Sequence, residues 1–142
     1  MVLKENISKA SFQLKLPATS ELFETPVSIH WFDKSGIMYA VSKKVERTVE
    51  HYKKVIELYA MFAKDRGKLC LLADSTNTMP MSKEVRSYLM TEMPKYIKAH
   101  AVISEVPFKG TKFKTFINLN FSGIPVALFP NEAEAKKWLK DF

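Results

Sequence analysis

Glycine and cysteine are scarce in this sequence, and their scarcity excludes several well-known functional motifs. Only four glycines occur in 142 residues, and neither a Walker loop nor a GxGxxG turn is present. A GxSxG nucleophile elbow is absent as well. The single cysteine, Cys70, has no partner for an internal disulfide and lies in an apolar run, where thiols are usually inert. We therefore expect Cys70 to be a core residue rather than a nucleophile.

Histidine is also sparse, and its placement argues against metal chemistry. The three histidines lie far apart in the sequence, each without a Cys, His or carboxylate neighbour at metal-ligand spacing. We expect no metal site, no cofactor and no catalytic residues, and we predict that the protein is not an enzyme. His30 is interpreted as a half-exposed side chain opposite the apolar face of a strand.

Long hydrophobic runs are missing. No apolar run approaches the roughly 20 residues that a membrane-spanning helix requires, and the N-terminal residues lack the apolar core of a signal peptide. We therefore expect a cytoplasmic protein. The net charge is +7, but the lysines are spread over nearly every segment, which favours solvated surfaces over a nucleic-acid or acidic-lipid interface.

The hydrophobic pattern predicts one α/β domain over residues 27–142, preceded by an N-terminal extension over residues 1–26. Within the extension, alternating apolar and polar side chains over residues 12–16 predict one short strand. The remainder of the extension is expected to be a connection, and it is the hardest part of the chain to interpret.

A hairpin and a long helix open the domain. Two strands, Val27–Phe32 and Ile37–Val41, flank the sequence Asp33-Lys34-Ser35-Gly36, which is typical of a type I turn. A strong amphipathic pattern then predicts a helix from Val45 to Gly67, with Arg47 among the charged residues of its polar face.

The central feature is an apolar run, Leu69–Ala73, which predicts a strand buried on both faces of a parallel sheet. It ends on Asp74, and a polar loop leads to Ser82, a good N-cap for a second helix. Ligands of open α/β sheets bind beyond the carboxyl ends of the strands, so we expect the functional site near this loop. The residues predicted to bind a partner or to carry regulation are Asp74, Ser75, Thr76, Asn77, Ser82, Lys83 and Arg86.

This loop also has a second interpretation, in which it is only a helix cap and a hydrogen-bonded turn. In the regulatory interpretation, a phosphate on Ser82 would lie at the positive end of the helix and be stabilised there. Both interpretations explain the residues of the loop, and the sequence leaves the choice open.

The remaining segments predict a strand at Ala101–Ile103, a helix over residues 109–121, a strand at Pro125–Phe129 and a final helix capped by Asn131. The aromatic side chains of the segment 109–121 are candidates for contact with an apolar ligand, although core packing is the alternative. These residues are Phe113, Phe116 and Phe121.

Three stretches in this order carry a resemblance to a known family: VSIHWFDKSGIMYAV, LLADSTNTMPMSKEVRSYL and PVALFPNEAEAKKWL. The chain resembles the STAS fold of bacterial anti-sigma-factor antagonists (SpoIIAA-like proteins), specifically a group of short stand-alone STAS-like domains of unassigned function. The resemblance covers most of residues 27–142. It implies an α/β fold with a mixed sheet, in which an N-terminal hairpin is followed by parallel strands, and about four helices packed mainly on one face. It also implies work by binding rather than by catalysis.

The resemblance fails at one functional position. In the antagonists, a serine of an Asp-Ser-Ser-Gly sequence at a helix start is phosphorylated by a partner kinase, which breaks the complex. Counted from Asp74, the aspartate of that sequence falls on Ser82 and the phosphorylated serine falls on Lys83. The chain thus lacks the serine that this switch uses.

These observations predict a non-enzymatic interaction or regulatory module with an unidentified protein partner, and a homo-oligomer is one form that the partnership could take. Two alternatives remain open. One is a carrier or sensor of a hydrophobic small molecule or lipid, because related CRAL-TRIO-type domains bind lipids. The other is a basic surface for nucleic acid or acidic lipid, which the scattered lysines favour least.

Overall fold

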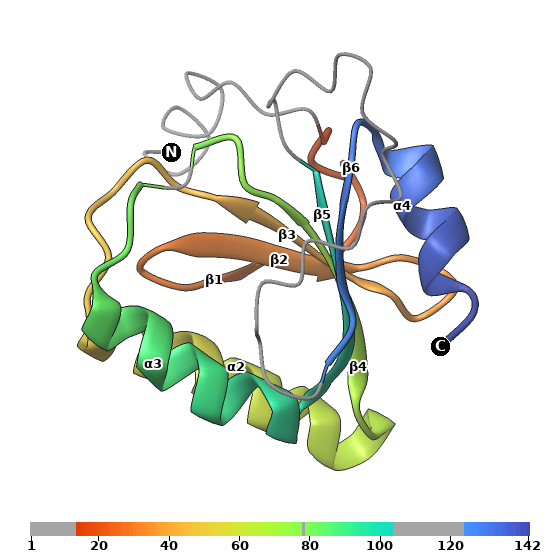
Figure 1. Ribbon diagram of the computed structural model, residues 1–142. Coiled ribbons are helices and arrows are strands. Elements are labelled where there is room, and N and C mark those ends of the chain that lie inside the picture. The colour runs from red at the N-terminus through yellow and green to blue at the C-terminus, as the bar shows by residue number, and fades with distance from the viewer. Residues whose placement is uncertain (1–13, 78, 104–123) are drawn as a thin grey trace.

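The protein forms a mixed six-stranded sheet in which the strands follow one another in chain order. The computed structural model describes residues 14–77, 79–103 and 124–142, and its layers are visible in Figure 1. The strands are β1 (Phe23–Glu24), β2 (Ser28–Phe32), β3 (Met38–Ser42), β4 (Leu69–Asp74), β5 (Ile97–Ile103) and β6 (Val126–Phe129). The helices are α2 (Val49–Arg66), α3 (Lys83–Glu92) and α4 (Glu132–Leu139), with a short 3-10 turn, η1 (Met93–Lys95).

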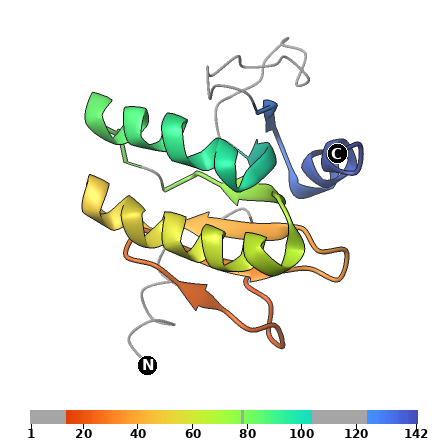
Figure 2. The same ribbon diagram turned by 90° about the horizontal axis from the view of Figure 1, so that it is seen from below.

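The sheet combines an antiparallel half with a parallel half. β1, β2 and β3 pair antiparallel, whereas β3, β4, β5 and β6 pair parallel. α2 and α3, which connect the parallel strands, lie side by side against one face of the sheet (Figure 2). α4 packs on the opposite face, where Ala135 and Leu139 join the core. The predicted α/β class and the hairpin followed by parallel strands are confirmed.

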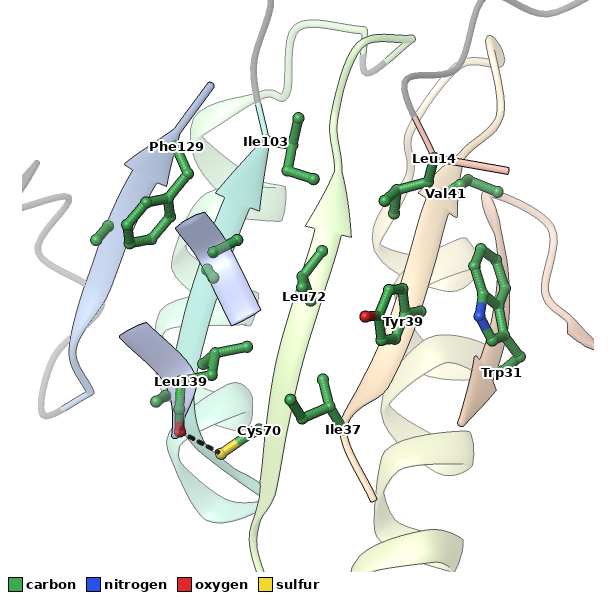
Figure 3. Close-up of a cluster of buried hydrophobic side chains, with 14 of the residues drawn as sticks. Leu14, Trp31, Ile37, Tyr39, Val41, Cys70, Leu72, Ile103, Phe129 and Leu139 are labelled. Atoms are coloured by element: carbon green, nitrogen blue, oxygen red, sulfur yellow. Dashed lines mark hydrogen bonds between the residues drawn. The ribbon is translucent and has the colours of Figure 1, made fainter. Parts of the chain in front are cut away.

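Each face of the sheet carries its own core because side chains alternate along every strand. Beneath α4, aromatic and branched side chains from five strands and the N-terminal segment form one cluster, shown in Figure 3. Leu72 lies at its centre and Cys70 at one end, with the Cys70 Sγ 4.0 Å from the carbonyl of Leu139. Cys70 is therefore a core residue, as predicted. The other core lies under α2 and α3.

Several predicted local signals form the structures that we expected. The carboxylate of Asp33 accepts hydrogen bonds from the amides of Ser35 at 2.9 Å and Ile37 at 3.0 Å, and Gly36 takes a φ of 91° that closes the hairpin turn. The hydroxyl of Ser82 accepts from the amide of Val85 at the start of α3. α2 ends at Gly67, as predicted.

Some elements differ from the predictions. α2 begins at Val49 rather than Val45, because the hydroxyl of Thr48 caps it by accepting from the amide of His51. β5 begins at Ile97, because its pairing with β4 extends to that residue. The strand of the N-terminal extension is β1, whereas residues 14–16 form no strand.

The predicted helix over residues 109–121, with Phe113, Phe116 and Phe121, lies outside the described residues, as do residues 12 and 13 of the extension. The expectation of about four helices is therefore not confirmed. Two of the three α-helices within the described ranges cover one face of the sheet, and the third covers the other.

Candidate functional site

A cavity of about 320 Å³ lies between the sheet and helices α2 and α3. Its floor is formed by small side chains on adjacent strands: Ala40 of β3 pairs with Ala73 of β4. Ser28 and Ser42, which pair across β2 and β3, continue the floor. Larger side chains at these positions would fill the space under the helices, so the cavity is a direct consequence of this small-residue pattern.

The walls come from the two helices and the segments that precede them. Tyr52, Val55 and Tyr59 line the cavity from α2, and Leu89 lines it from α3. Met81 lies just before α3, at the end of the loop that follows β4. The cavity therefore extends to the carboxyl ends of β3 and β4, which is where open α/β sheets place their ligands.

His30 is buried in the cavity lining, with 1% of its surface exposed. Its Nε2 lies 2.7 Å from the hydroxyl of Ser28, and its ring meets that of Tyr59 edge to face at 5.6 Å between centroids. Its Nδ1 has no hydrogen-bond partner within the described part of the chain. Burial lowers the pKa of His30 to about 3, so the imidazole is neutral at pH 7. The expectation of a half-exposed His30 is wrong, since the face opposite Ile29 and Trp31 is covered by helices.

His100 lines the cavity from β5, where it pairs with Leu71. Neither of its ring nitrogens has a hydrogen-bond partner among the residues that the structure describes. Burial lowers the pKa of His100 to about 4. A neutral imidazole carries one donor and one acceptor, so His100 offers both to an occupant of the cavity.

Arg47 also lines the cavity and is 6% exposed. Its Nη1 donates to the carbonyl of Val27 at 2.9 Å and to the hydroxyl of Tyr52 at 3.4 Å. Its Nη2 donates to the carbonyl of Lys43 at 2.7 Å. The Nε has no acceptor in the described ranges. Burial lowers the pKa of Arg47 and outweighs the opposing effect of Tyr52.

The predicted loop is divided between the two faces of the sheet. Ser75 lines the cavity, and both its amide and its hydroxyl donate to the carbonyl of Ile103, at 3.1 and 3.3 Å. Asp74 points to the opposite face, where its carboxylate accepts from the amides of Leu14 and Thr76, each at 3.0 Å. Of the residues predicted for the site, the structure thus brings Ser75 into the cavity and places Asp74 outside it.

The other predicted residues lie along the outer surface or within the loop. Ser82 and Lys83 are exposed at the start of α3, and Arg86 donates to the carbonyl of Met81 at 3.1 Å. Thr76 and Asn77 are partly exposed, and the hydroxyl of Thr76 has no partner among the described residues. The exposed part of this set forms a surface beside the cavity rather than a second pocket.

Among the lining residues that are absent from the sequence-based prediction are His30, His100 and Arg47. A signal was available for His30, since it alternates along β2 with Phe32, which packs against the core under α2 and α3. Arg47 carried a misleading signal, because it fits the polar face of the predicted helix, whereas α2 begins at Val49, two residues after Arg47.

The described residues form an α/β domain with a mixed sheet, helices on both faces and one cavity reaching the carboxyl ends of the parallel strands. The chain belongs to the family described as a domain of unknown function, DUF7793, whose profile matches residues 30–142. The match includes His30, Arg47 and His100. Comparison with curated proteins and with solved structures gives no match. None of the described helices is long and apolar enough to cross a membrane.

Proposed function

We propose that this domain binds a small, largely apolar molecule in the cavity and acts as a carrier or sensor of it. The observation that carries the proposal is the cavity itself, at about 320 Å³. Small-molecule sites of proteins range from about 300 to 1,000 Å³ and combine apolar walls with a few polar groups. The cavity under α2 and α3 has both features, with Val55 and Leu89 as apolar walls and the two histidines and Arg47 as polar groups.

The size of the cavity argues for an occupant. Protein interiors are close-packed and hold few voids larger than a water molecule. The cavity of about 320 Å³ is partly open to solvent and has largely apolar walls, so water that enters it finds few hydrogen-bond partners there. A ligand with an apolar body would displace this water and gain contacts with the walls.

A sensor also needs a surface that responds, and the loop between β4 and α3 offers one. Ser75 and Met81 of this loop line the cavity, while Ser82 and Lys83 are exposed next to it. Movement of the loop on ligand binding would change the surface predicted for a protein partner. The predicted interaction module and the ligand carrier are therefore compatible functions of one domain.

The experiment is native mass spectrometry of the protein purified from its own cells, compared with Ala40→Leu and Ala133→Leu variants. Ala40 lines the cavity, whereas Ala133 is exposed on α4 and serves as the matched control. We expect a bound mass of a few hundred daltons in the wild type and in Ala133→Leu, and none in Ala40→Leu.

Stability distinguishes a filled cavity from a damaged fold. Each buried methylene contributes about 0.8 kcal/mol, so Ala40→Leu should leave the domain as stable as the ligand-free wild type or stabilise it by up to about 2 kcal/mol. A wild-type chain without bound mass, together with an Ala40→Leu variant that is strongly destabilised, would show that the space does not exist and would refute the proposal.

A further inference from the structure

The charge of Arg47 is uncompensated where it is buried. Its hydrogen bonds go to two backbone carbonyls and one tyrosine hydroxyl, and no carboxylate lies within ion-pair distance of it among the described residues. Buried charges are normally paired, because removal of an ion from water carries a large penalty. Neutral oxygens satisfy part of the guanidinium but leave its net charge without a partner.

Arg47 lines the cavity and keeps one donor without an acceptor among the described residues. A guanidinium has five N–H donors, and the structure assigns acceptors to Nη1 and Nη2 but none, within the described chain, to Nε. The hydroxyl of Tyr52, 3.4 Å from Nη1, lines the same cavity. An oxygen acid entering here would meet the guanidinium and the hydroxyl together.

The rest of the cavity limits the ligand to one charge. Arg47 is the one cationic side chain in its described lining, and the two histidines there are neutral at pH 7. The lining extends over five adjacent strands, from His30 on β2 to Leu128 on β6, which is about 19 Å at the usual spacing between strands.

We infer that the ligand is a monocarboxylic acid with an apolar body, held by Arg47 and Tyr52 at its carboxylate and by the walls of α2 and α3 along its length. This inference rests on the proposed function, because it names the ligand class of the same cavity. A phosphate would bring a second charge without a second cation to meet it, so the carboxylate fits the donor set better.

The experiment compares acids with uncharged amides of the same shape. Calorimetric titration at pH 7.5 uses octanoate against octanamide and 3-phenylpropanoate against 3-phenylpropanamide, so that a flexible and an aromatic body are both represented. For at least one pair we expect the acid to bind tenfold or more tightly than its amide, since a hydrogen bond to a charged group is worth about a factor of 10 to 100.

Variants assign the preference to Arg47. Arg47→Met should lower the affinity for the acid to that for the amide. The affinity for the amide itself should change by no more than about twofold. Since Arg47 also holds the carbonyls of Val27 and Lys43, this variant could lose its fold, and Tyr52→Phe is the second test. This variant removes one hydroxyl and should weaken the binding of the acid about 3- to 10-fold, with little effect on the binding of the amide.

The outcomes separate this inference from the proposed function. Equal binding of acid and amide, abolished for both by Ala40→Leu, would overturn the carboxylate inference and leave the cavity as a ligand site. An acid preference that survives both Arg47→Met and Tyr52→Phe would also overturn it. If neither pair binds, the inference fails, and the native mass spectrum decides by itself whether the proposed function fails with it.

Discussion

Acid should destabilise this domain through His30 and His100, because burial keeps both imidazoles neutral in the folded protein. Burial lowers the pKa of His30 to about 3 and that of His100 to about 4, while an unfolded chain keeps histidine near 6.5. The unfolded state therefore binds more protons than the folded state as the pH falls below 6.5. The stability is complete above pH 6.5 and is lost progressively between 6.5 and the folded pKa values.

The magnitude follows from the slope. Each histidine removes about 1.4 kcal/mol per pH unit below its unfolded pKa. Between pH 7.5 and pH 5.0 this amounts to about 2 kcal/mol per histidine and about 4 kcal/mol for both. The carboxylate of Asp33 does not interfere in this window, because its hydrogen bonds lower its pKa below the ordinary value of 3.8. A domain of ordinary stability, about 5 to 15 kcal/mol, would lose a large share.

The assay is urea unfolding at pH 5.0, 5.75, 6.5 and 7.5, followed by tryptophan fluorescence, for the wild type, His30→Gln and His100→Gln. Each variant should lose about half of the pH dependence, whatever its stability at pH 7.5, because it removes one of the two titrating groups. The comparison uses the slope, so a general loss of packing does not imitate the result. A wild-type change below about 1 kcal/mol over this window, or an unchanged slope in both variants, would refute the reasoning.

Two further predictions concern single contacts. Ser82→Ala should destabilise the domain by about 1 kcal/mol, measured by urea unfolding, because it removes the cap of α3; a change below about 0.3 kcal/mol would contradict the role of the cap. Cys70 should react with a thiol reagent only at the rate of unfolding, because it is buried under α4 and burial raises the pKa of its thiol; rapid labelling of the native protein would contradict its place in the core.

The sequence was informative wherever a structure is determined by neighbours along the chain. The turn from Asp33 to Gly36 is closed by the Asp33 side chain. Ser82 and Asn131 each cap a helix by accepting a hydrogen bond from the amide three residues further along the chain. These features depend on local hydrogen bonds, which a short stretch of sequence specifies. The start of β5 at Ile97 is different, because its pairing with Leu69 across the sheet extends it, and no local pattern reports that contact.

The cavity could not be predicted for the same reason. Its floor needs Ala40 and Ala73 on neighbouring strands, and its polar groups come from β2, β5 and the segment before α2. Only the pairing of the strands across the sheet, antiparallel between β2 and β3 and parallel from β3 to β5, brings these residues together. The rule that ligands bind beyond the carboxyl ends of strands located the loop next to the cavity, and Ser75 is where the two meet.

In the proposed function, Ser75 links the ligand cavity to the surface that is predicted to bind a partner. Its side chain lines the cavity, and its hydroxyl and amide hold the carbonyl of Ile103 at the end of β5. The neighbouring Asp74 holds the amide of Leu14 on the other face of the sheet. A ligand that shifts Ser75 therefore acts on both faces at once, whereas a ligand at the exposed end of α3 would act on one. Thermodynamic coupling between two binding sites is reciprocal. If a ligand in the cavity changes the affinity for a partner that binds this loop, the partner would therefore change the affinity for the ligand by the same factor.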